Sequence, residues 1–338
     1  MHDRCVRADD NSDVNDGQGV RNTSLGLYML SCNRRAFLAG TVTWLGVFSQ
    51  PYRTEGQTRT RLILLGTGGG PRPRKANSAS AQVIIRNDAA YVIDCGNGVA
   101  RQLAFADVPL PTLRHIFVTH HHSDHDADYG NLIWLAWAAG LPTQVDTWGP
   151  PPLAKMTRRF FEMNAYDIHT RTADEGRVPL EPLVHVHELH QGGLVMRDDQ
   201  VMVRATIVDH PSVVPSFAYR FDAADRSIVI SGDTARSDKL VKLAEGADVL
   251  VHSAVYLSAI DRLVTRVPNA ASLKRSIIAG QTSAEDAGSV AQAAGVKTLV
   301  LSHLIPADDP EVTEQMWAEA ARIHFRGSVI VGRDLLEV

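Results

Sequence analysis

Four histidines and one aspartate occupy five of the six consecutive positions 120–125 of this chain. They follow Ile116–Thr119, an apolar run that is typical of a β-strand. In an extended chain, residues two positions apart point to the same side, so His120 and His122 can bind one metal ion together. Asp124 and His125 follow at the turn into the next helix, where they can face a second position. Nitrogen and oxygen ligands of this kind suit zinc-like divalent ions, although a solvated polyhistidine turn would also explain this short segment on its own.

Three further ligand-type residues recur at equivalent places in the sequence, and this recurrence favours the metal site over the polyhistidine turn. Each of them follows an apolar, strand-like run within three positions: His210 after Val201–Val208, Asp233 after Ser227–Ile230 and His303 after Thr298–Leu301. Because α/β sites form where the ends of strands gather on one side of a sheet, we expect these three side chains to join the first cluster.

These residues, in this order, resemble the metallo-β-lactamase superfamily, and the resemblance extends over about residues 61–338. Shorter motifs resemble its ribonuclease Z and arylsulfatase-like branch. They are Leu65-Gly66-Thr67-Gly68, Ile93-Asp94-Cys95-Gly96-Asn97-Gly98, Arg101-Gln102-Leu103, Ser216-Phe217-Ala218-Tyr219-Arg220 and Ser231-Gly232-Asp233-Thr234. The match is specific for fold and metal and much less specific for substrate.

The resemblance implies an α/β fold, the four-layer αββα sandwich, with two divalent metal ions, zinc being the expected metal. His120, His122 and His210 would bind the first ion, Asp124, His125 and His303 the second, and Asp233 would bridge both. Asp94 would be a buried acceptor for a ligating histidine. Hydroxide held by the metals would be the nucleophile, with Asp124 orienting it. His252 could assist catalysis, or it is a buried histidine with satisfied hydrogen bonds.

The pattern of elements agrees with a layered α/β domain, because short β-rich runs alternate with helical patterns. The expected strands are Leu62–Leu65, Ala81–Ile85, Ala90–Ile93, Ile116–Thr119, Val201–Val208, Ser216–Phe221, Ser227–Ile230, Val249–Val251, Thr298–Leu301 and Ser328–Val331. The expected helices are Ala127–Ala139, Pro152–Met163, Asp238–Ala244, Ala284–Ala294 and Pro310–His324.

Two other segments have alternative interpretations. The glycine-rich loop 67–71 lacks the spacing and the lysine of a phosphate-binding loop, so we expect a tight turn that lets backbone approach the site. His185 and His187 could be a metal pair, but alternation favours the polar face of an edge strand.

The first 54 residues are expected to lie outside the folded domain. Residues 1–27 are polar and rich in Asp and Asn, which is typical of disorder, and Met29 is an alternative start. Arg34 and Arg35 precede Phe37 and a mildly apolar run, an order that resembles a twin-arginine export signal. A basic turn before an amphipathic helix is the alternative. The signal predicts a periplasmic or exported protein; without it the protein would be cytoplasmic.

Composition limits the function classes. The 338 residues are 44% hydrophobic and 21% charged, which is ordinary globular usage, and the formal net charge is −4. A generic nucleic-acid binder leans basic, and no glycine- and basic-rich arm stands between Asp124 and His210. No run of 18 apolar residues is present, which excludes a multi-span membrane protein. Three cysteines, Cys5, Cys32 and Cys95, are too few for a disulfide framework.

Two departures from the family pattern shape the expected substrate. The resemblance to ribonuclease Z implies a histidine at the place where Gln281 stands, and often an acidic residue where Ser253 follows His252. An amide cannot act as an acid, so we expect a substrate with a good leaving group: a small ester, aryl sulfate or phosphodiester. A lactonase or acyl hydrolase, a tRNA 3′-processing endonuclease and a degenerate binding protein are alternatives. We expect no membrane and no nucleic acid as partner; a homodimer is left open.

Overall fold

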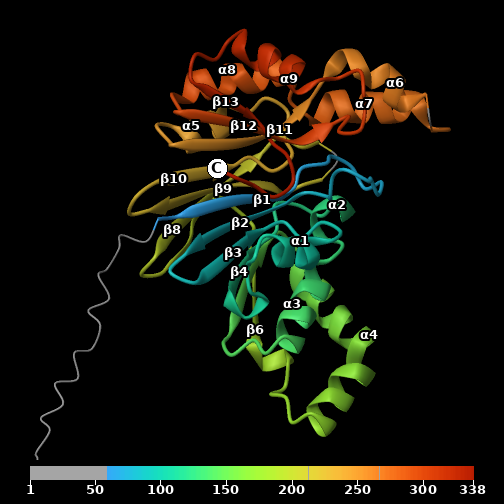
Figure 1. Ribbon diagram of the computed structural model, residues 1–338, viewed down its shortest axis with the longest axis vertical. Coiled ribbons are helices and arrows are strands. Elements are labelled where there is room, and N and C mark those ends of the chain that lie inside the picture. Colours follow the sequence, from blue (N-terminus) through green and yellow to red (C-terminus); the bar gives the residue numbers. More distant parts are fainter. Residues whose placement is uncertain (1–58, 212, 266) are drawn as a thin grey trace, which may run out of the picture. The chain divides into compact units, whose positions relative to one another are not determined.

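Two seven-stranded β-sheets face each other in the computed structural model, which describes residues 59–338 apart from Ser212 and Arg266 (Figure 1). The first sheet has the order β14-β1-β2-β3-β4-β5-β6 and the second the order β13-β12-β11-β10-β9-β8-β7. In each sheet four neighbouring strands are parallel, β3 to β6 and β10 to β13, and the remaining pairs are antiparallel.

The strands of the first sheet are β1 Arg61–Gly66, β2 Ala81–Arg86, β3 Ala89–Ile93, β4 Leu113–Phe117, β5 Val145–Gly149, β6 Val184–Glu188 and β14 Leu336–Glu337. Those of the second are β7 Gly193–Arg197, β8 Val201–Val208, β9 Ser216–Ala223, β10 Ser227–Ile230, β11 Val249–Val255, β12 Thr298–Ile305 and β13 Ser328–Val331.

Helices cover the outer face of each sheet (Figure 1). The first sheet is covered by α1 Val99–Phe105, α3 Tyr129–Ala138 and α4 Leu153–Asp174, and the second by α5 Asp238–Ala244, α8 Ala284–Ala294 and α9 Glu314–Arg322. The other helices are α2 Ser123–Asp126, α6 Ile260–Val264 and α7 Ala270–Gly280, with 3₁₀ turns at Leu110–Thr112, Glu181–Leu183 and Leu257–Ala259. The predicted four-layer αββα sandwich is therefore confirmed.

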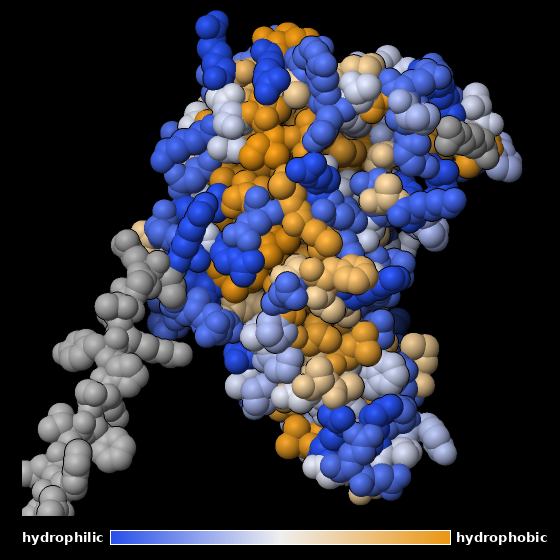
Figure 2. All heavy atoms as spheres, viewed as in Figure 1, coloured by the Kyte–Doolittle hydropathy of each residue, from blue (hydrophilic) through white to orange (hydrophobic). Residues whose placement is uncertain are grey.

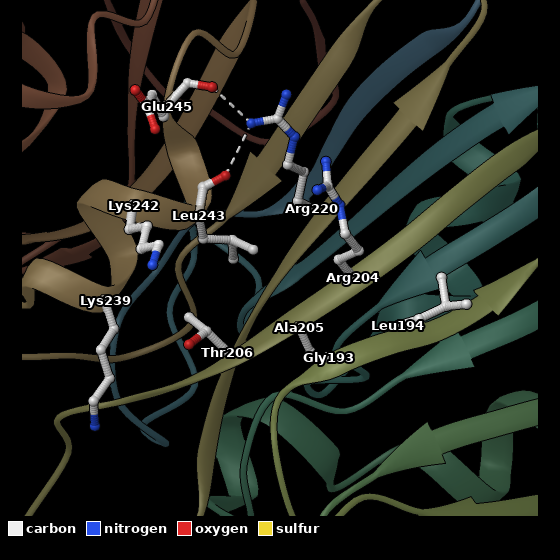
Figure 3. A pocket seen from close by; sticks show the side chains of 10 residues that line it. All are labelled: Gly193, Leu194, Arg204, Ala205, Thr206, Arg220, Lys239, Lys242, Leu243 and Glu245. Carbon is white, nitrogen blue, oxygen red and sulfur yellow. Dashed lines mark hydrogen bonds between the residues drawn. The ribbon is translucent and has the colours of Figure 1, made fainter.

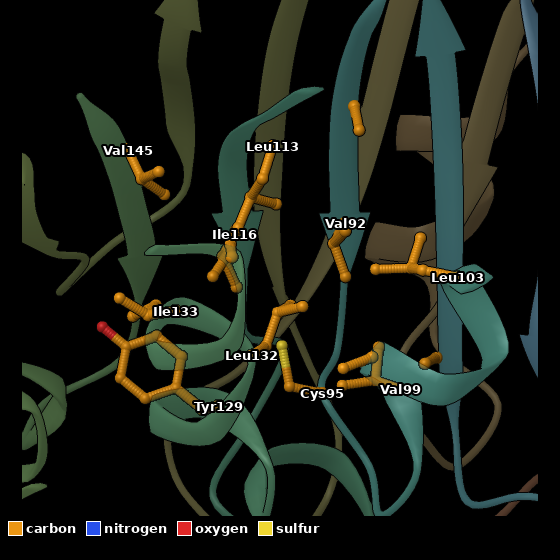
Figure 4. Packing of buried hydrophobic residues seen from close by; sticks show 14 of the residues in the cluster. Val92, Cys95, Val99, Leu103, Leu113, Ile116, Tyr129, Leu132, Ile133 and Val145 are labelled. Carbon is orange, nitrogen blue, oxygen red and sulfur yellow. The ribbon is translucent and has the colours of Figure 1, made fainter. Parts of the chain in front are cut away.

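Three apolar clusters hold the four layers together: one lies between the sheets, and one lies between each sheet and the helices that cover it. Between the sheets, Phe117 of β4 meets Phe221 of β9 edge to face, with ring centroids 5.1 Å apart. On the outer face of the first sheet, Val92 and Ile116 pack against Leu132 of α3 (Figure 4). Cys95 is fully buried in the same cluster, so its thiol packs rather than binds a ligand. Burying one such side chain contributes about 1.5–3 kcal/mol, so these clusters dominate the stability of the domain.

The long helix α4 buries only one of its faces. Its buried residues are Leu153, Thr157, Phe161 and Ile168, a spacing that places them on one side of the helix. Hydrophilic side chains cover its outer surface at the lower end of Figure 2, whereas hydrophobic residues form a band down the middle of that view.

Several predicted elements differ from the observed ones at their ends. The predicted helix Ala127–Ala139 corresponds to α3, which begins at Tyr129 and ends at Ala138, because Asp128 before it is not in the helical conformation. The predicted helix Pro152–Met163 continues to Asp174. Helices α1, α2, α6 and α7 and strands β5, β7 and β14 were not expected; most are short and carry weak apolar periodicity.

The edge-strand interpretation of His185 and His187 agrees with the structure. Both lie on β6, which is the edge of the first sheet, and the Nε2 atom of His187 lies 2.8 Å from an Asp146 carboxylate oxygen. Neither belongs to a candidate metal group of the described residues.

The proposed export signal at Arg34 and Arg35, together with Cys5 and Cys32, lies outside the described residues. Within residues 59–338, with their two gaps, no helix is both long and apolar enough to cross a membrane.

Candidate metal centre

Strands from both sheets deliver the predicted ligands to one place. His120 follows β4 by three residues, His122 precedes α2, and His210 follows β8. Asp233 follows β10, and His303 lies on β12. The seven predicted residues form two adjacent groups, each with its ligand atoms within 4.8 Å of one another: His120, His122, His210 and Asp233, and Asp124, His125 and His303.

In the first group, ring nitrogens converge on one point. The Nδ1 atom of His122 lies 3.1 Å from Nε2 of His120 and 3.4 Å from Nε2 of His210. Nitrogens bound at about 2.0–2.1 Å to a tetrahedral ion lie roughly 3.3 Å apart. The three imidazoles are thus spaced as ligands of a single ion would be.

Asp233 lies between the two groups. Its Oδ1 atom is 3.5 Å from Nε2 of His125 and 3.3 Å from Nδ1 of His303, while the residue also belongs to the first group. The Oδ2 atom of Asp124 is 3.0 Å from Nε2 of His303 and 3.7 Å from Nε2 of His125. Asp233 thus occupies the position that a bridging carboxylate needs, since each of its two oxygens can face a different ion.

The outer nitrogens of the histidines have partners that fix the rings. The Nδ1 atom of His125 lies 2.7 Å from Oδ2 of Asp94. The Thr119 hydroxyl donates to the same oxygen, and the Thr119 backbone N–H donates to Oδ1. The Nδ1 atom of His210 lies 2.9 Å from the carbonyl oxygen of Gly280. Such contacts orient metal-binding imidazoles and raise their basicity. Asp94 therefore holds the place expected of it from the sequence.

Two residues at the site adopt backbone conformations that L-residues rarely occupy. Asp94 has a φ of 59° and His303 a φ of 47°. The pairing of β11 with β12 shifts register between Ser253 and Ala254, so His303 is the extra residue of a bulge inside β12. The prediction that His303 follows a strand ending at Leu301 is therefore wrong in detail, because β12 continues to Ile305 and the bulge re-aims one side chain.

The site has two features that bear on cation binding: buried polar atoms without a partner, and several buried carboxylates. Among the described residues, Nε2 of His125, Nδ1 of His303 and Oδ1 of Asp233 are buried without a hydrogen-bond partner. Burial alone would raise the pKa of Asp124, but His125 and His303 hold it below its usual range, so the carboxylate is ionised. Burial would lower the pKa of His125, but Asp233, Asp94 and Asp124 together raise it well above its ordinary value. Such an excess of buried carboxylate calls for cations, and the residues fit two divalent ions.

The glycine-rich loop closes over the second group, as expected from the sequence. A Cβ atom on Gly69 would lie 2.8 Å from Nδ1 of His303, so only glycine allows this approach. The backbone N–H of Gly70 donates to Oδ2 of Asp124 at 2.8 Å. The loop thus positions a predicted catalytic carboxylate through its backbone.

A cavity of about 10 Å³ lies behind the metal groups, between the two sheets. Ser253, Ser302 and Gln82 line it, and each has a buried side-chain oxygen without a partner among the described residues. Space of this size holds at most one water molecule. Ser253, which stands where the family resemblance implies an acidic residue, therefore faces the site.

His252, a predicted catalytic residue, lies on the other face of β11. Side chains alternate along a strand, and its neighbour Ser253 lines the inter-sheet cavity whereas Leu250 and Ala254 belong to the helix-facing cluster. The imidazole is fully buried, and burial lowers its pKa to about 4. The Nδ1 atom lies 2.7 Å from the carbonyl oxygen of Ser253, whereas Nε2 is buried without a partner among the described residues. The placement therefore favours a structural role for His252, but only one of its two ring nitrogens has a hydrogen-bond partner within the described part of the chain.

Gln281, whose position the sequence left open, contacts the carboxylate between the two groups. Its Nε2 atom donates to Oδ2 of Asp233 at 2.5 Å, and its Oε1 atom is buried without a partner among the described residues. Gln281 directly follows Gly280, the last residue of α7, whose carbonyl oxygen lies 2.9 Å from Nδ1 of His210. This adjacency is the sequence signal that could have identified the contact.

Comparison with known proteins agrees with this geometry. The family model of the β-lactamase superfamily domain matches residues 90–304. Ribonuclease Z of Mycobacterium bovis (strain BCG / Pasteur 1173P2) is 32% identical over 280 residues, covering 82% of this chain and 97% of the relative. Ribonuclease Z of Mycobacterium sp. (strain KMS) is 34% identical over 279 residues, covering 82% and 95%.

Solved structures show the same fold. The metallo-β-lactamase fold protein YhfI from Bacillus subtilis aligns with a TM-score of 0.62 at 20% identity, covering 82% of this chain and 98% of that one. The short form of human tRNase Z aligns with a TM-score of 0.60 at 23% identity, covering 82% and 98%.

The relatives correct two expectations drawn from the sequence. A small ester such as an aryl sulfate, or a lactone, is wrong as the expected substrate class, because the relatives matched over nearly their whole length are ribonucleases Z. The expectation that nucleic acid is an improbable partner is wrong for the same reason. Net charge sums over the whole chain, whereas a polyanion responds to the local field, and single exchanges such as Gln281 and Ser253 alter one contact rather than the substrate class.

Proposed function

The chain belongs to the metallo-β-lactamase superfamily, in its ribonuclease Z branch, and is a metal-dependent hydrolase; we propose that it is a ribonuclease that cleaves a phosphodiester bond of a tRNA precursor. The observation that carries this proposal is the convergence of all seven ligand-type residues in a chain that matches ribonuclease Z over 82% of its length. Two adjacent cation positions suit phosphodiester hydrolysis, whose transition state carries negative charge on several oxygens.

The residues of the site divide the work between binding ions and orienting groups. His120, His122 and His210 would hold one ion, Asp124, His125 and His303 the other, with Asp233 between them. A two-metal site supplies a nucleophile at neutral pH and neutralises charge on the reacting phosphate.

Asp124 is 5% exposed and fixed by the backbone of Gly70, so it can accept a hydrogen bond from the attacking water and hold it in line. Its lowered pKa keeps it an acceptor at neutral pH.

We further propose zinc as the metal. The donor set combines five imidazoles with two carboxylates, and a protein offering so many nitrogen ligands suits zinc better than the oxygen-seeking magnesium or calcium. Elemental analysis of protein purified without added metal tests this proposal: about two zinc ions per chain are expected, and a preparation that is fully active with manganese or iron alone would contradict it.

The test of the function is cleavage of a labelled tRNA precursor that carries a 3′ trailer. Purified protein is expected to release the trailer at one position, to leave the matching tRNA without a trailer intact, and to lose activity on treatment with a chelator. The variant Asp233→Ala is the control for contaminating nucleases and should be inactive. A protein that contains both metals and hydrolyses bis(p-nitrophenyl) phosphate, yet leaves several different precursors uncut, would overturn the proposal.

A further inference from the structure

A second pocket, of about 730 Å³, lies on the second sheet away from the seven ligand residues (Figure 3). Strands β7, β8 and β9 form its floor and α5 forms one wall. Four cationic side chains line it, Arg204, Arg220, Lys239 and Lys242, against a single acidic one, Glu245. The pocket is therefore a local concentration of positive charge on a chain whose net charge is −4.

The two arginines are held in place on the sheet. Arg204 and Arg220 are directly opposite each other on β8 and β9, and both pair with the carboxylate of Asp222, at 2.7 and 2.8 Å. Arg220 also donates to the carbonyl oxygens of Leu243 and Glu245, at 2.9 and 2.8 Å. A single carboxylate cannot neutralise two guanidinium groups, so the floor of the pocket keeps a positive charge.

The two lysines extend from the wall and have no acidic partner within the described part of the chain. Lys239 and Lys242 are three positions apart on α5, so they share one side of the helix, and both are exposed. Figure 3 shows both ammonium groups on the α5 side of the pocket, with that of Lys239 directed away from the two arginines. Exposed ammonium groups without a counter-charge are available to an anionic ligand.

The pocket and the metal centre share their supporting elements. Arg204 is six residues before His210, so the two lie no more than about 20 Å apart at 3.3 Å per residue. Lys239 is likewise six residues after Asp233. A single RNA can span that distance while one of its phosphodiester bonds occupies the metal centre.

We infer that this pocket binds the phosphate backbone of the RNA substrate at a distance from the scissile bond. The inference rests on the proposed function. Lys239 and Lys242 contact phosphate oxygens, and Arg204 and Arg220 supply a fixed positive field beneath them. The contact depends on the charge of the RNA backbone and not on its base sequence. It contributes to affinity without touching the reacting phosphate.

The experiment compares Lys239→Glu/Lys242→Glu with two matched variants. Lys239→Arg/Lys242→Arg keeps the charge, and Arg322→Glu/Arg326→Glu makes the same charge change on exposed residues at the end of α9. The dissociation constant of a labelled tRNA without a trailer is measured by fluorescence anisotropy between 50 and 200 mM salt. Hydrolysis of bis(p-nitrophenyl) phosphate reports on the metal centre of each variant.

The glutamate pair is expected to bind tRNA about tenfold or more weakly at 50 mM salt, with the slope of log affinity against log salt reduced by about two. The arginine pair and the α9 control should bind like the wild type, and all variants should hydrolyse the small diester at the same rate. Wild-type affinity and salt slope in the glutamate pair would overturn the inference, as would a wild type that binds no tRNA.

The outcome separates this inference from the proposed function. If the wild type cuts tRNA precursors and the glutamate pair binds tRNA normally, the pocket inference falls alone. If no precursor is cut but the glutamate pair loses tRNA affinity, the pocket binds RNA and the proposed reaction is wrong.

Discussion

The Nδ1 atom of His125 and the Oδ2 atom of Asp94 are 2.7 Å apart, and this contact decides that Nε2 of His125 faces the metal centre. Asp94 can make it because its backbone turns into the left-handed region directly after β3 and brings the carboxylate beneath Thr119. A strained backbone position thus sets the tautomer of one predicted ligand.

Asp94→Asn is expected to lower metal affinity by about 10–100-fold, because the amide is a weaker acceptor for the imidazole N–H. Asparagine tolerates a positive φ, so the fold should be preserved. Competition with a chromophoric chelator measures the affinity. Asp248→Asn, which alters a carboxylate bonded to Ser227 and Lys297 away from the site, is the control and should bind metal normally. Equal affinities in both variants would show that Asp94 does not orient His125.

Asp233→Ala is expected to abolish turnover and to lower the total bound metal, because it removes the carboxylate that lies between the two groups. Metal analysis after gel filtration, together with precursor cleavage, measures both effects. Retention of two metals with a near-normal rate would show that the bridging assignment is wrong.

Much of the site was predictable because its residues follow strands that are recognisable from their apolar patterns. β8 and β10 begin and end at the predicted residues. A histidine or aspartate that directly follows such a strand lies where the strand ends gather, and this is where sites form in α/β folds. His303 was less well predicted, because a bulge has no apolar pattern of its own: the strand continues past the ligand, and only the register of β11 against β12 reveals the extra residue.

The role of His252 shows what a linear pattern cannot resolve. Adjacent residues of a strand face opposite sides, so only one of His252 and Ser253 can face the site, and the sequence alone does not say which. The basic pocket was missed for a similar reason. Arg204, Arg220 and Lys239 are 16 to 35 positions apart in the sequence, and only the pairing of β8 with β9 and the packing of α5 bring them together.

His252→Leu is expected to make the protein less sensitive to acid. Burial lowers the pKa of His252 to about 4, against an ordinary value near 6.5, so between these pH values the unfolded chain binds a proton that the folded chain does not. The free energy of unfolding of the wild type should therefore fall, relative to the variant, by up to about 3 kcal/mol as the pH decreases from 7 to 4.

Urea unfolding of both proteins at the same series of pH values measures this difference, with His169→Leu on the exposed face of α4 as the matched histidine-to-leucine control. The rate of precursor cleavage by His252→Leu at pH 7.5 should stay within a few-fold of the wild type. A loss of activity comparable to that of Asp233→Ala would restore His252 as a catalytic residue.

Replacing both Arg34 and Arg35 by lysine is expected to leave the protein in the cytoplasm, if these residues form a twin-arginine signal. Cell fractionation with an antibody against the folded domain measures the distribution. The result bears on the proposed function as well, because export would separate the enzyme from tRNA. Unchanged fractionation of the lysine variant would remove the twin-arginine interpretation.

Gln281 allows a test of how the leaving group obtains its proton. The side chain donates to Asp233 and is therefore within reach of the metal centre, but an amide cannot protonate a departing alkoxide. Either ribose oxygen of an RNA phosphodiester leaves as an alkoxide, and general acid assistance is typically worth about 10²–10⁴-fold. Gln281→His should thus raise the rate for diesters with alkyl leaving groups, while aryl diesters, whose phenolates need no proton, should react at nearly the same rate.

The measurement is a series of phosphodiesters with different leaving groups, with log rate plotted against leaving-group pKa for the wild type, Gln281→His and Gln281→Met. The methionine variant removes the hydrogen bond to Asp233 without adding an acid, so it separates the positioning of the carboxylate from proton donation. A flatter slope in the histidine variant alone supports acid catalysis from this position. Equal slopes in all three proteins would mean that another group already supplies the proton, and that the amide at position 281 serves only to hold the carboxylate between the two metal-binding groups.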